Sequence, residues 1–238
     1  MICGFIRALI VLALTVCSSV PPYFMGLVGS NEKAAHFMRW WGRAFIRIGG
    51  WSVEVRGMEN LPEGSAVLVS NHQSLVDIPL LLTVFPRPVG FISKRELERI
   101  PLFGKAMAAA GNIFVERGNP QDARRMFGEA AERLLAGQLL VIFPEGRRTR
   151  DGQIGPFKTG AFRLALQTGV PVVPVFINGG YCVLPRGARR FRPGRLSVRV
   201  LPPLSAEEMA GGVKKQVALS VRERILAAAS AAGGGTAG

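Results

Sequence analysis

Histidine and cysteine are scarce in this sequence. The chain has two histidines, His36 and His72, and three cysteines, Cys3, Cys17 and Cys182. A zinc site would have to combine scattered ligands of different kinds, so we expect no metal centre. An odd number of cysteines without a Cys-x-x-Cys pair is not typical of a disulfide framework, and we expect none here.

Acidic residues are also few. Sixteen Asp and Glu against 30 Lys and Arg give a formal net charge of +14, which excludes an acidic or calcium-buffering chain and predicts an anionic partner. Charged residues nevertheless make up only 19% of the chain and apolar ones 48%, unlike a charge-dense polybasic tail. This combination favours a folded protein that works on a membrane surface or on amphiphilic anions, with a basic nucleic-acid binder as the alternative.

The common nucleotide and hydrolase motifs are missing. The sequence contains no Gly-x-x-x-x-Gly-Lys-Ser/Thr loop and no Gly-x-Ser-x-Gly elbow. Gly233, Gly235 and Gly238 spell Gly-x-Gly-x-x-Gly, but no strand pattern precedes them and no helix pattern follows, so they cannot cradle a pyrophosphate. Nucleotide hydrolysis and serine-hydrolase chemistry are therefore disfavoured.

Near the N-terminus, residues 8–29 form an uncharged apolar run of 22 residues, close to the roughly 20 that a membrane-spanning helix needs. We expect Pro21 and Pro22 to end the helix and leave a short apolar segment. This segment could span a thinned bilayer, enter it and return, or form the apolar part of a signal peptide behind Arg7. The absence of an Ala-x-Ala-like cleavage site near Cys17 argues against the signal peptide.

Residues 34–48 have the pattern of an amphipathic helix, with a basic stripe opposite an apolar face. The basic stripe comprises His36, Arg39, Arg43 and Arg47. The apolar face comprises Phe37, Trp41, Ala44 and Ile48, beside a second tryptophan, Trp40. We expect this helix to lie in the headgroup region of a membrane, and the alternative is a core-packing helix with a solvated basic face.

Basic residues follow the apolar run more densely than they precede it. Lys33 and the three arginines of the amphipathic helix lie downstream, against Arg7 upstream. Because positive charge is retained on the cytoplasmic side, this pattern predicts a membrane-associated protein whose main body is cytoplasmic.

From residue 50 onward, short β-rich runs alternate with helical patterns. Strands are predicted at 51–56, 66–70, 89–93, 112–116, 139–143, 171–177 and 196–201, and helices at 74–83, 102–110, 120–135 and 156–168. This order predicts an α/β fold in which a single, largely parallel or mixed sheet is flanked by helices. Functional loops are then expected at the carboxyl ends of the strands.

The chain divides into three expected regions. Residues 1–48 are N-terminal membrane-associating helices, 49–204 an α/β domain, and 205–238 a C-terminal helix and flexible tail. The helix is expected to begin at Ser205-Ala-Glu-Glu208, which has the capping-box pattern.

A histidine and an aspartate stand five residues apart directly after the strand predicted at 66–70. On a helix of ~3.6 residues per turn such positions differ by about 140°, so His72 can contact Asp77 only from the turn before the helix. Histidine is suited to accept a proton near neutral pH, and a carboxylate on its other nitrogen fixes the tautomer. In the alternative, Ser74 and Asp77 are only a helix-capping pair.

Three further blocks follow His72-x-x-x-x-Asp77 in order. They are Lys94-Arg-Glu-Leu97 with Ile100-Pro-Leu-Phe-Gly104 and Ile113-Phe-Val-Glu-Arg117, then Phe143-Pro-Glu-Gly-Arg-Arg-Thr149, then Val172-Val-Pro-Val175. In this order, over about residues 66–180, the four motifs resemble those of the glycerolipid acyltransferase family, typified by bacterial 1-acylglycerol-3-phosphate acyltransferases. Arg147 and Thr149 replace the family's usual Thr and Ser, so its arginine maps to Arg148.

The resemblance implies transfer of an acyl group from acyl-CoA or acyl carrier protein to the free hydroxyl of 1-acylglycerol-3-phosphate (lysophosphatidate). The product would be phosphatidate, made without a cofactor at a bacterial inner membrane. His72 would be the general base and Asp77 its orienting partner, with no acyl-enzyme because the substrate's hydroxyl replaces an enzyme serine. Backbone amides around residues 71–74 are expected to hold the oxyanion.

The resemblance also implies which residues bind the acceptor. Arg148 is the first candidate for the phosphate, with Arg147, Lys94, Arg117 and Lys158 as helpers, and a solvated basic surface is the alternative. Glu145 would accept a hydrogen bond from glycerol or orient an arginine, and Gly146 would leave room, although turn roles fit both. The acyl-channel candidates are Val172, Val173, Pro174 and Val175, where a buried strand would look the same.

Six arginines crowd the stretch 186–199, outside the four motifs. Because Phe191 is its only aromatic residue and no nucleic-acid motif accompanies it, we expect an anionic lipid or an acidic acyl donor as partner and no nucleic acid. A solvated surface is the alternative. The rival functions are an acyltransferase for another lysolipid and a non-catalytic basic membrane or lipid-binding protein.

Overall fold

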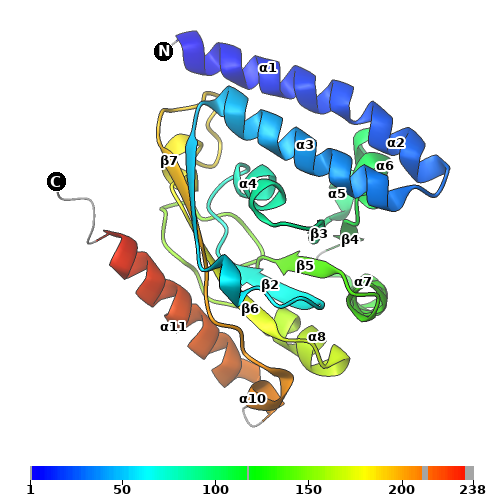
Figure 1. The fold of residues 1–238 in the computed structure, drawn as a ribbon, viewed down its shortest axis with the longest axis vertical. Helices are drawn as coiled ribbons and strands as arrows, with labels where there is room; N and C mark the ends of the chain where they lie inside the picture. The colour runs from blue at the N-terminus through cyan, green and yellow to red at the C-terminus, as the bar shows by residue number, and fades with distance from the viewer. Residues whose placement is uncertain (1, 117, 211–213, 234–238) are drawn as a thin grey trace.

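A mixed sheet runs through the centre of the molecule, with helices on both faces (Figure 1). The computed structural model describes residues 2–116, 118–210 and 214–233, and within them the sheet has seven strands in the order β1-β7-β6-β2-β5-β3-β4. The strands are β1 Ser52–Arg56, β2 Ala66–Ser70, β3 Val89–Lys94, β4 Ile113–Val115, β5 Leu139–Ile142, β6 Val172–Asn178 and β7 Arg195–Val200. Strands β6, β2, β5, β3 and β4 are parallel, β7 runs antiparallel to β6, and β1 is parallel to β7.

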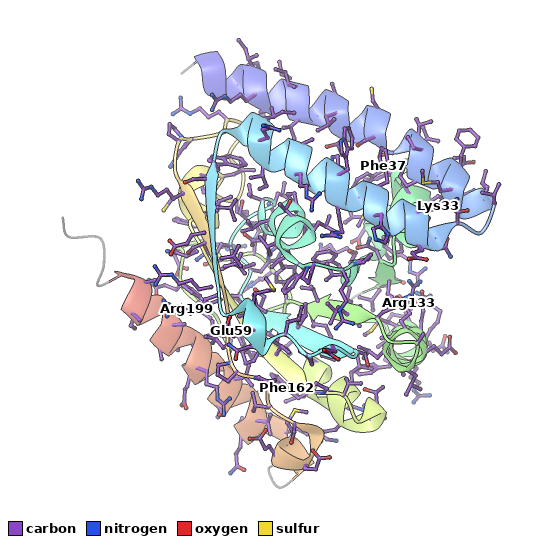
Figure 2. The ribbon with its side chains drawn as sticks, in the orientation of Figure 1. Lys33, Phe37, Glu59, Arg133, Phe162 and Arg199 are labelled. Atoms are coloured by element: carbon purple, nitrogen blue, oxygen red, sulfur yellow. The ribbon has the colours of Figure 1, made fainter. Side chains whose placement is uncertain are left out.

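Helices cover both faces because the central strands are apolar on both sides. In β2, Ala66 and Leu68 join one core cluster and Val67 and Val69 the other. The first face carries α3 (Asn31–Gly49) and α4 (Asp77–Val84); the second carries α7 (Pro120–Leu135), α8 (Gly160–Thr168) and α11 (Lys214–Gly233). Phe162 of α8 is fully buried in the second cluster (Figure 2). The predicted α/β fold is confirmed.

Short helices occupy the connections between these elements. They are η1 Met58–Asn60, α5 Arg95–Glu98, α6 Phe103–Ala109, α9 Gly180–Val183 and α10 Ala206–Ala210. The capping box predicted at Ser205 is present, since Ser205 and Glu208 each donate a backbone N–H to the other's side chain. Residues 234–238 of the expected tail lie outside the described residues.

The first N-terminal helix ends just before the prolines, and a second helix begins there. Helix α1 spans Ile2–Ser18, and α2, Val20–Leu27, starts with Pro21 in its first turn. The expected break before Pro21 is present, but the apolar segment continues as a second helix, because proline is tolerated at a helix start, where its missing N–H has no partner to lose. The segment Gly4–Leu27 is long and apolar enough to cross a membrane, with a mean hydropathy of 1.8 and only 17% of the most apolar window buried.

Helix α3 packs on the domain as well as presenting a basic face. Its buried face contains Met38, Trp41 and Phe45 and lies against α4. Arg39 Nη2 donates to the Phe85 carbonyl at 2.8 Å, so that arginine serves the α3–α4 interface. The core-packing alternative therefore describes this face. The outer face presents exposed His36, Trp40, Arg43 and Arg47, and Phe37, Ala44 and Ile48 are half-buried.

A cluster of ion pairs and hydrogen bonds around Asp122 joins three elements beside the sheet. Asp122 of α7 accepts hydrogen bonds from Arg95 of α5, from Arg125, and from the backbone N–H of Glu116 just after β4. The Glu116 N–H and the two guanidinium groups lower the pKa of Asp122 from 3.8 to about 2. This cluster fixes α5, which directly follows Lys94 at the end of β3.

We predict that Asp122→Asn lowers the free energy of unfolding at pH 7. Because the pKa of Asp122 is lower in the folded protein, its stabilisation is fully present above the unfolded value of 3.8 and is lost as the pH falls to about 2. Denaturant unfolding as a function of pH should therefore show a flatter acid limb between these values for the variant. Glu132→Gln, at an exposed position on the same helix outside the described ion pairs, is the control, and equal acid limbs in both variants would contradict the prediction.

Candidate active site

Four loops meet at the carboxyl edge of the parallel strands. They follow β6, β2, β5 and β3, which are neighbours in the sheet. The loop after β2 carries His72, the loop after β5 carries residues 145–150, and β3 itself ends at Lys94. Because parallel strands all present their carboxyl ends on one edge, residues far apart in sequence come together there.

His72 and Asp77 are in contact. His72 Nδ1 lies 2.8 Å from Asp77 Oδ2, and the carboxylate is fully buried. Since a carboxylate accepts hydrogen bonds, Nδ1 is the protonated nitrogen and Nε2 keeps its lone pair. Nε2 has no hydrogen-bond partner within the described chain, and the His72 ring stacks on Phe143 with centroids 3.9 Å apart. The pair thus has the geometry of an oriented general base.

The same oxygen of Asp77 makes both the capping contacts and the contact with His72. Asp77 Oδ2 also accepts the backbone N–H of Gln73 at 2.6 Å and of Ser74 at 2.8 Å. Helix α4 begins at Asp77, three residues later than predicted, because these bonds hold residues 73–76 in a turn. The carboxylate therefore fixes the turn and the imidazole together.

The turn is tied to β6 and to the segment behind it. The side-chain amide of Asn71 donates to the Ile177 carbonyl at 2.9 Å and accepts the Ile177 N–H at 2.8 Å, which joins the ends of β2 and β6. Gly180 comes so close that a Cβ there would lie 2.6 Å from Asp77 Oδ1, an oxygen without a hydrogen-bond partner in the described chain. Glycine is required at this position because no larger residue fits against the carboxylate.

Glu145 holds the loop after β5 to the turn that carries His72. Its Oε1 accepts the N–H of His72 at 2.8 Å and its Oε2 the N–H of Gly155 at 3.0 Å. Burial raises the pKa of Glu145, and the two hydrogen bonds oppose that shift. Both oxygens are thus used inside the protein, where sequence reasoning expected a contact with glycerol or an arginine.

The amides expected to form an oxyanion hole are also in use. The N–H groups of residues 72, 73 and 74 are bonded to Glu145 and Asp77. They are therefore not free donors, and the expectation is wrong for residues 72–74, because the carboxylates of Asp77 and Glu145 use those donors.

The dyad opens on a cavity of about 460 Å³ with basic and apolar walls. Its basic residues are Lys94, Arg147, Arg148, Arg150 and Arg186. Its apolar residues are Leu75, Ile78, Phe91, Ile92, Leu97 and Phe143. A cavity with these two walls fits a ligand that has an anionic head and an aliphatic chain.

Most of the predicted phosphate ligands reach this cavity. Lys94, Arg147 and Arg148 line it together with His72. Arg148 is half-buried, and burial, followed by the positive charge of Arg186, lowers its pKa, while Asp77 opposes the shift.

Of three other residues of the predicted site, one lines this cavity, one lies in a neighbouring cavity and one is outside the described residues. Gly146 lines the cavity with a φ of 72°, so it also serves the turn. Lys158 lies behind it, in a neighbouring cavity of about 600 Å³. Arg117 lies outside the described residues.

The structure does not bring the acyl-channel candidates to the site. Val172, Val173, Pro174 and Val175 lie in β6 between β2 and β7, where the three valines have no exposed surface. They form part of both core clusters, so the buried-strand alternative describes them. The apolar wall beside His72 comes instead from α4 and the turn before it, from β3, from α5 and from Phe143 just after β5.

The sequence motifs do not predict every residue of the site. Arg186 lies in the arginine-rich stretch for which an anionic lipid or an acidic acyl donor is expected, Phe143 lies in a motif block without a predicted role of its own, and Gly180 lies outside the predicted site. The Gly179-Gly180 pair directly after a strand is a signal for close backbone approach. Nothing local in the sequence marks Arg186 as different from its neighbours. Among the described residues, no group of three or more His, Cys, Asp or Glu side chains is placed to hold a metal ion.

Comparisons with known proteins identify the family. The chain matches the Acyltransferase family over residues 52–178. It is 37% identical to 1-acyl-sn-glycerol-3-phosphate acyltransferase alpha of Mus musculus over 226 residues, which cover 94% of this chain and 76% of the relative. The human protein of the same name is 36% identical over 225 residues, covering 94% and 77%.

A solved structure has the same fold. The crystal structure of the 1-acyl-sn-glycerophosphate (LPA) acyltransferase PlsC from Thermotoga maritima matches with a TM-score of 0.71 and 30% identity, over 92% of this chain and 94% of that one. The chain belongs to the acyltransferase family and is a transferase.

We predict that Gly180→Ala strongly reduces acyl transfer while leaving the protein folded. The new Cβ would displace Asp77 Oδ1 and would lie 3.1 Å from the Ser74 Cβ, so the imidazole loses its alignment. A displacement of this kind costs roughly 100-fold in rate. Steady-state kinetics and thermal melting measure the two properties. Gly128→Ala, at an exposed helical position with no neighbouring atoms within 4 Å, is the control, and equal activity of the two variants would contradict the prediction.

Proposed function

We propose that the protein transfers an acyl group from acyl-CoA or acyl carrier protein to the free hydroxyl of 1-acylglycerol-3-phosphate, giving phosphatidate. The observation that carries the proposal is the His72–Asp77 pair opening on a cavity with both a basic and an apolar wall. The names of the mouse, human and Thermotoga relatives support the same acceptor.

His72 acts as the general base in this scheme. Nε2 accepts the proton of the acceptor hydroxyl as its oxygen attacks the thioester carbonyl, and Asp77 stabilises the imidazolium that forms. The C–S bond of the tetrahedral intermediate then breaks, and the thiolate takes the proton from His72. No acyl-enzyme forms, because the attacking oxygen belongs to the acceptor.

The cations of the cavity supply the electrostatic part of the reaction. Because the amides of residues 72–74 are bonded internally, the oxyanion is stabilised by a positive side chain, Lys94, which lines the same cavity as His72. Arg148 binds the acceptor phosphate, with Arg147 as a helper. Lys158 and Glu145 support the loop that carries both arginines.

The apolar wall accommodates aliphatic chain. Leu75 comes from the turn before α4, Ile78 from the start of α4, Phe91 from β3, and Leu97 from α5. Leu75 is about half exposed, so the wall continues to the surface of the protein. A lysolipid can then place its chain along this wall and its phosphate beside Arg148.

The N-terminal helices associate with the membrane. Large apolar side chains are exposed along α1 and α2, at Phe5, Ile6, Leu9, Ile10, Leu12, Val16, Val20, Phe24 and Leu27. Such a continuous apolar surface is costly in water and is stabilised in a bilayer. Exposed Arg43 and Arg47 on α3 face anionic headgroups on the cytoplasmic side.

We predict that His72→Ala abolishes phosphatidate formation, with a loss of roughly 10³-fold or more, because the general base is removed. The measurement supplies purified protein with lysophosphatidate and either acyl-CoA or acyl carrier protein thioester. His36→Ala is the matched control, since His36 is exposed on α3 and its ring bonds only to the Glu32 carbonyl.

Two outcomes of this assay oppose the proposal. Phosphatidate formation by wild-type protein no faster than by His72→Ala, with both donors, would exclude it. Faster transfer to a different lysolipid would retain the chemistry and correct the acceptor.

We predict that Leu12→Glu weakens binding to anionic vesicles by roughly 10-fold or more, because a buried leucine contributes about 1.5–3 kcal/mol that the charge removes. Vesicle sedimentation measures the bound fraction. Leu135→Glu is the control, because Leu135 is 73% exposed on α7, away from the N-terminal helices. If both variants bind as wild type does, the α1 surface is not the membrane contact.

A further inference from the structure

The arginine-rich segment between α9 and β7 is held in place at both ends. Ser74 Oγ donates to the Leu184 carbonyl at 2.7 Å, directly beside the catalytic turn. Trp51 Nε1 donates to the Arg192 carbonyl at 2.8 Å. Phe191 is buried, with its ring centroid 4.9 Å from that of Trp51. The segment is therefore a supported part of the fold and presents its arginines from fixed positions.

Arg186 differs from its neighbours in this segment because it reaches the cavity. It lines the cavity with His72 and Arg148. Within the described ranges, no carboxylate lies within ion-pair distance of Arg186 or Arg148. Two guanidinium groups that face one cavity without a counter-ion repel each other until an anion lies between them. The lowered pKa of Arg148, caused in part by Arg186, agrees with this repulsion.

We propose that Arg186 is the second cation of the acceptor-phosphate site and that, with Arg148, it selects phosphomonoester acceptors. This inference rests on the function proposed above. The two guanidinium groups come from the loops after β6 and β5, two strands that flank β2 and its His72. They therefore bind the phosphate from two sides while its glycerol extends toward the imidazole.

Charge matching gives the selectivity. A phosphomonoester carries about −1.5 to −2 charge near pH 7, and two arginines match it with bidentate hydrogen bonds. A phosphodiester lysolipid carries a single negative charge and a bulky second substituent, so it cannot neutralise both cations. Removing Arg186 should therefore weaken the monoester more than the diester.

The other arginines of the segment provide a matched control. Arg190 lies four residues from Arg186 in the same segment and is also exposed, but it does not line the cavity. Arg190→Ala lowers the net charge of the protein by one unit, as Arg186→Ala does. Any difference between the two variants therefore reports on position in the cavity.

The test compares Arg186→Ala, Arg186→Lys and Arg190→Ala in steady-state assays with lysophosphatidate and with a lysophosphatidylglycerol as acceptor. We expect Arg186→Ala to raise KM for lysophosphatidate by roughly 10- to 100-fold with a smaller change in kcat, because a charged hydrogen-bond pair is lost. The ratio of kcat/KM for monoester over diester should fall, Arg186→Lys should be intermediate, and Arg190→Ala should match wild type. Equal KM values for Arg186→Ala and Arg190→Ala would overturn the inference.

A binding measurement separates this inference from the proposed function. Calorimetric titration of the His72→Ala protein with glycerol 3-phosphate, with and without Arg186→Ala, needs no turnover. Loss of binding on removal of Arg186 supports the inference even if wild-type protein does not acylate lysophosphatidate. If wild-type protein makes phosphatidate but the Arg186→Ala exchange changes neither binding nor KM, the inference fails and the proposed function stands.

Discussion

One oxygen of Asp77 determines how the site is built. Oδ2 accepts the imidazole N–H of His72 and two backbone N–H groups of the turn, all from a position without solvent exposure. Three donors stabilise a buried carboxylate that would otherwise be strongly disfavoured. The same contacts delay the start of α4 until Asp77 and leave the imidazole oriented. The conformation of the turn, the start of α4 and the orientation of the His72 imidazole thus depend on one group.

A second carboxylate extends this arrangement to the neighbouring loop. Glu145 accepts the His72 N–H on one side and the Gly155 N–H on the other, so the turn that carries His72 positions the loop after β5. Both acids are occupied by N–H donors, and neither neutralises an arginine. The positive charge of Arg147, Arg148 and Arg186 therefore remains available to an anionic ligand in the cavity.

Local signals predicted those parts of the structure that depend on neighbours in sequence. Residues 120–135 form a helix as predicted because Asn119 caps it and Pro120 starts it. The His72–Asp77 contact follows similarly from one turn. Features that depend on the arrangement of the strands in the sheet were not predictable from local sequence. The apolar stretch 172–175, for example, has a pattern that fits both an acyl channel and a central strand. Arg186 joins the site only because β6 lies beside β2. The prolines mark the end of α1, but they also lie in the first turn of a second helix.

The arginine-rich segment between α9 and β7 is in contact with the N-terminal helices. The Phe191 N–H donates to the Gly4 carbonyl at 3.2 Å, so the segment that carries Arg186 rests on α1 (Figure 1). Phe191 also packs beside Phe45 of α3, with ring centroids 5.8 Å apart. The segment that contributes Arg186 to the basic cavity is therefore also in contact with the N-terminal helices α1 and α3. Under the proposed function, the aliphatic chain of an amphiphilic acceptor contacts apolar surface, and its phosphate contacts the arginines.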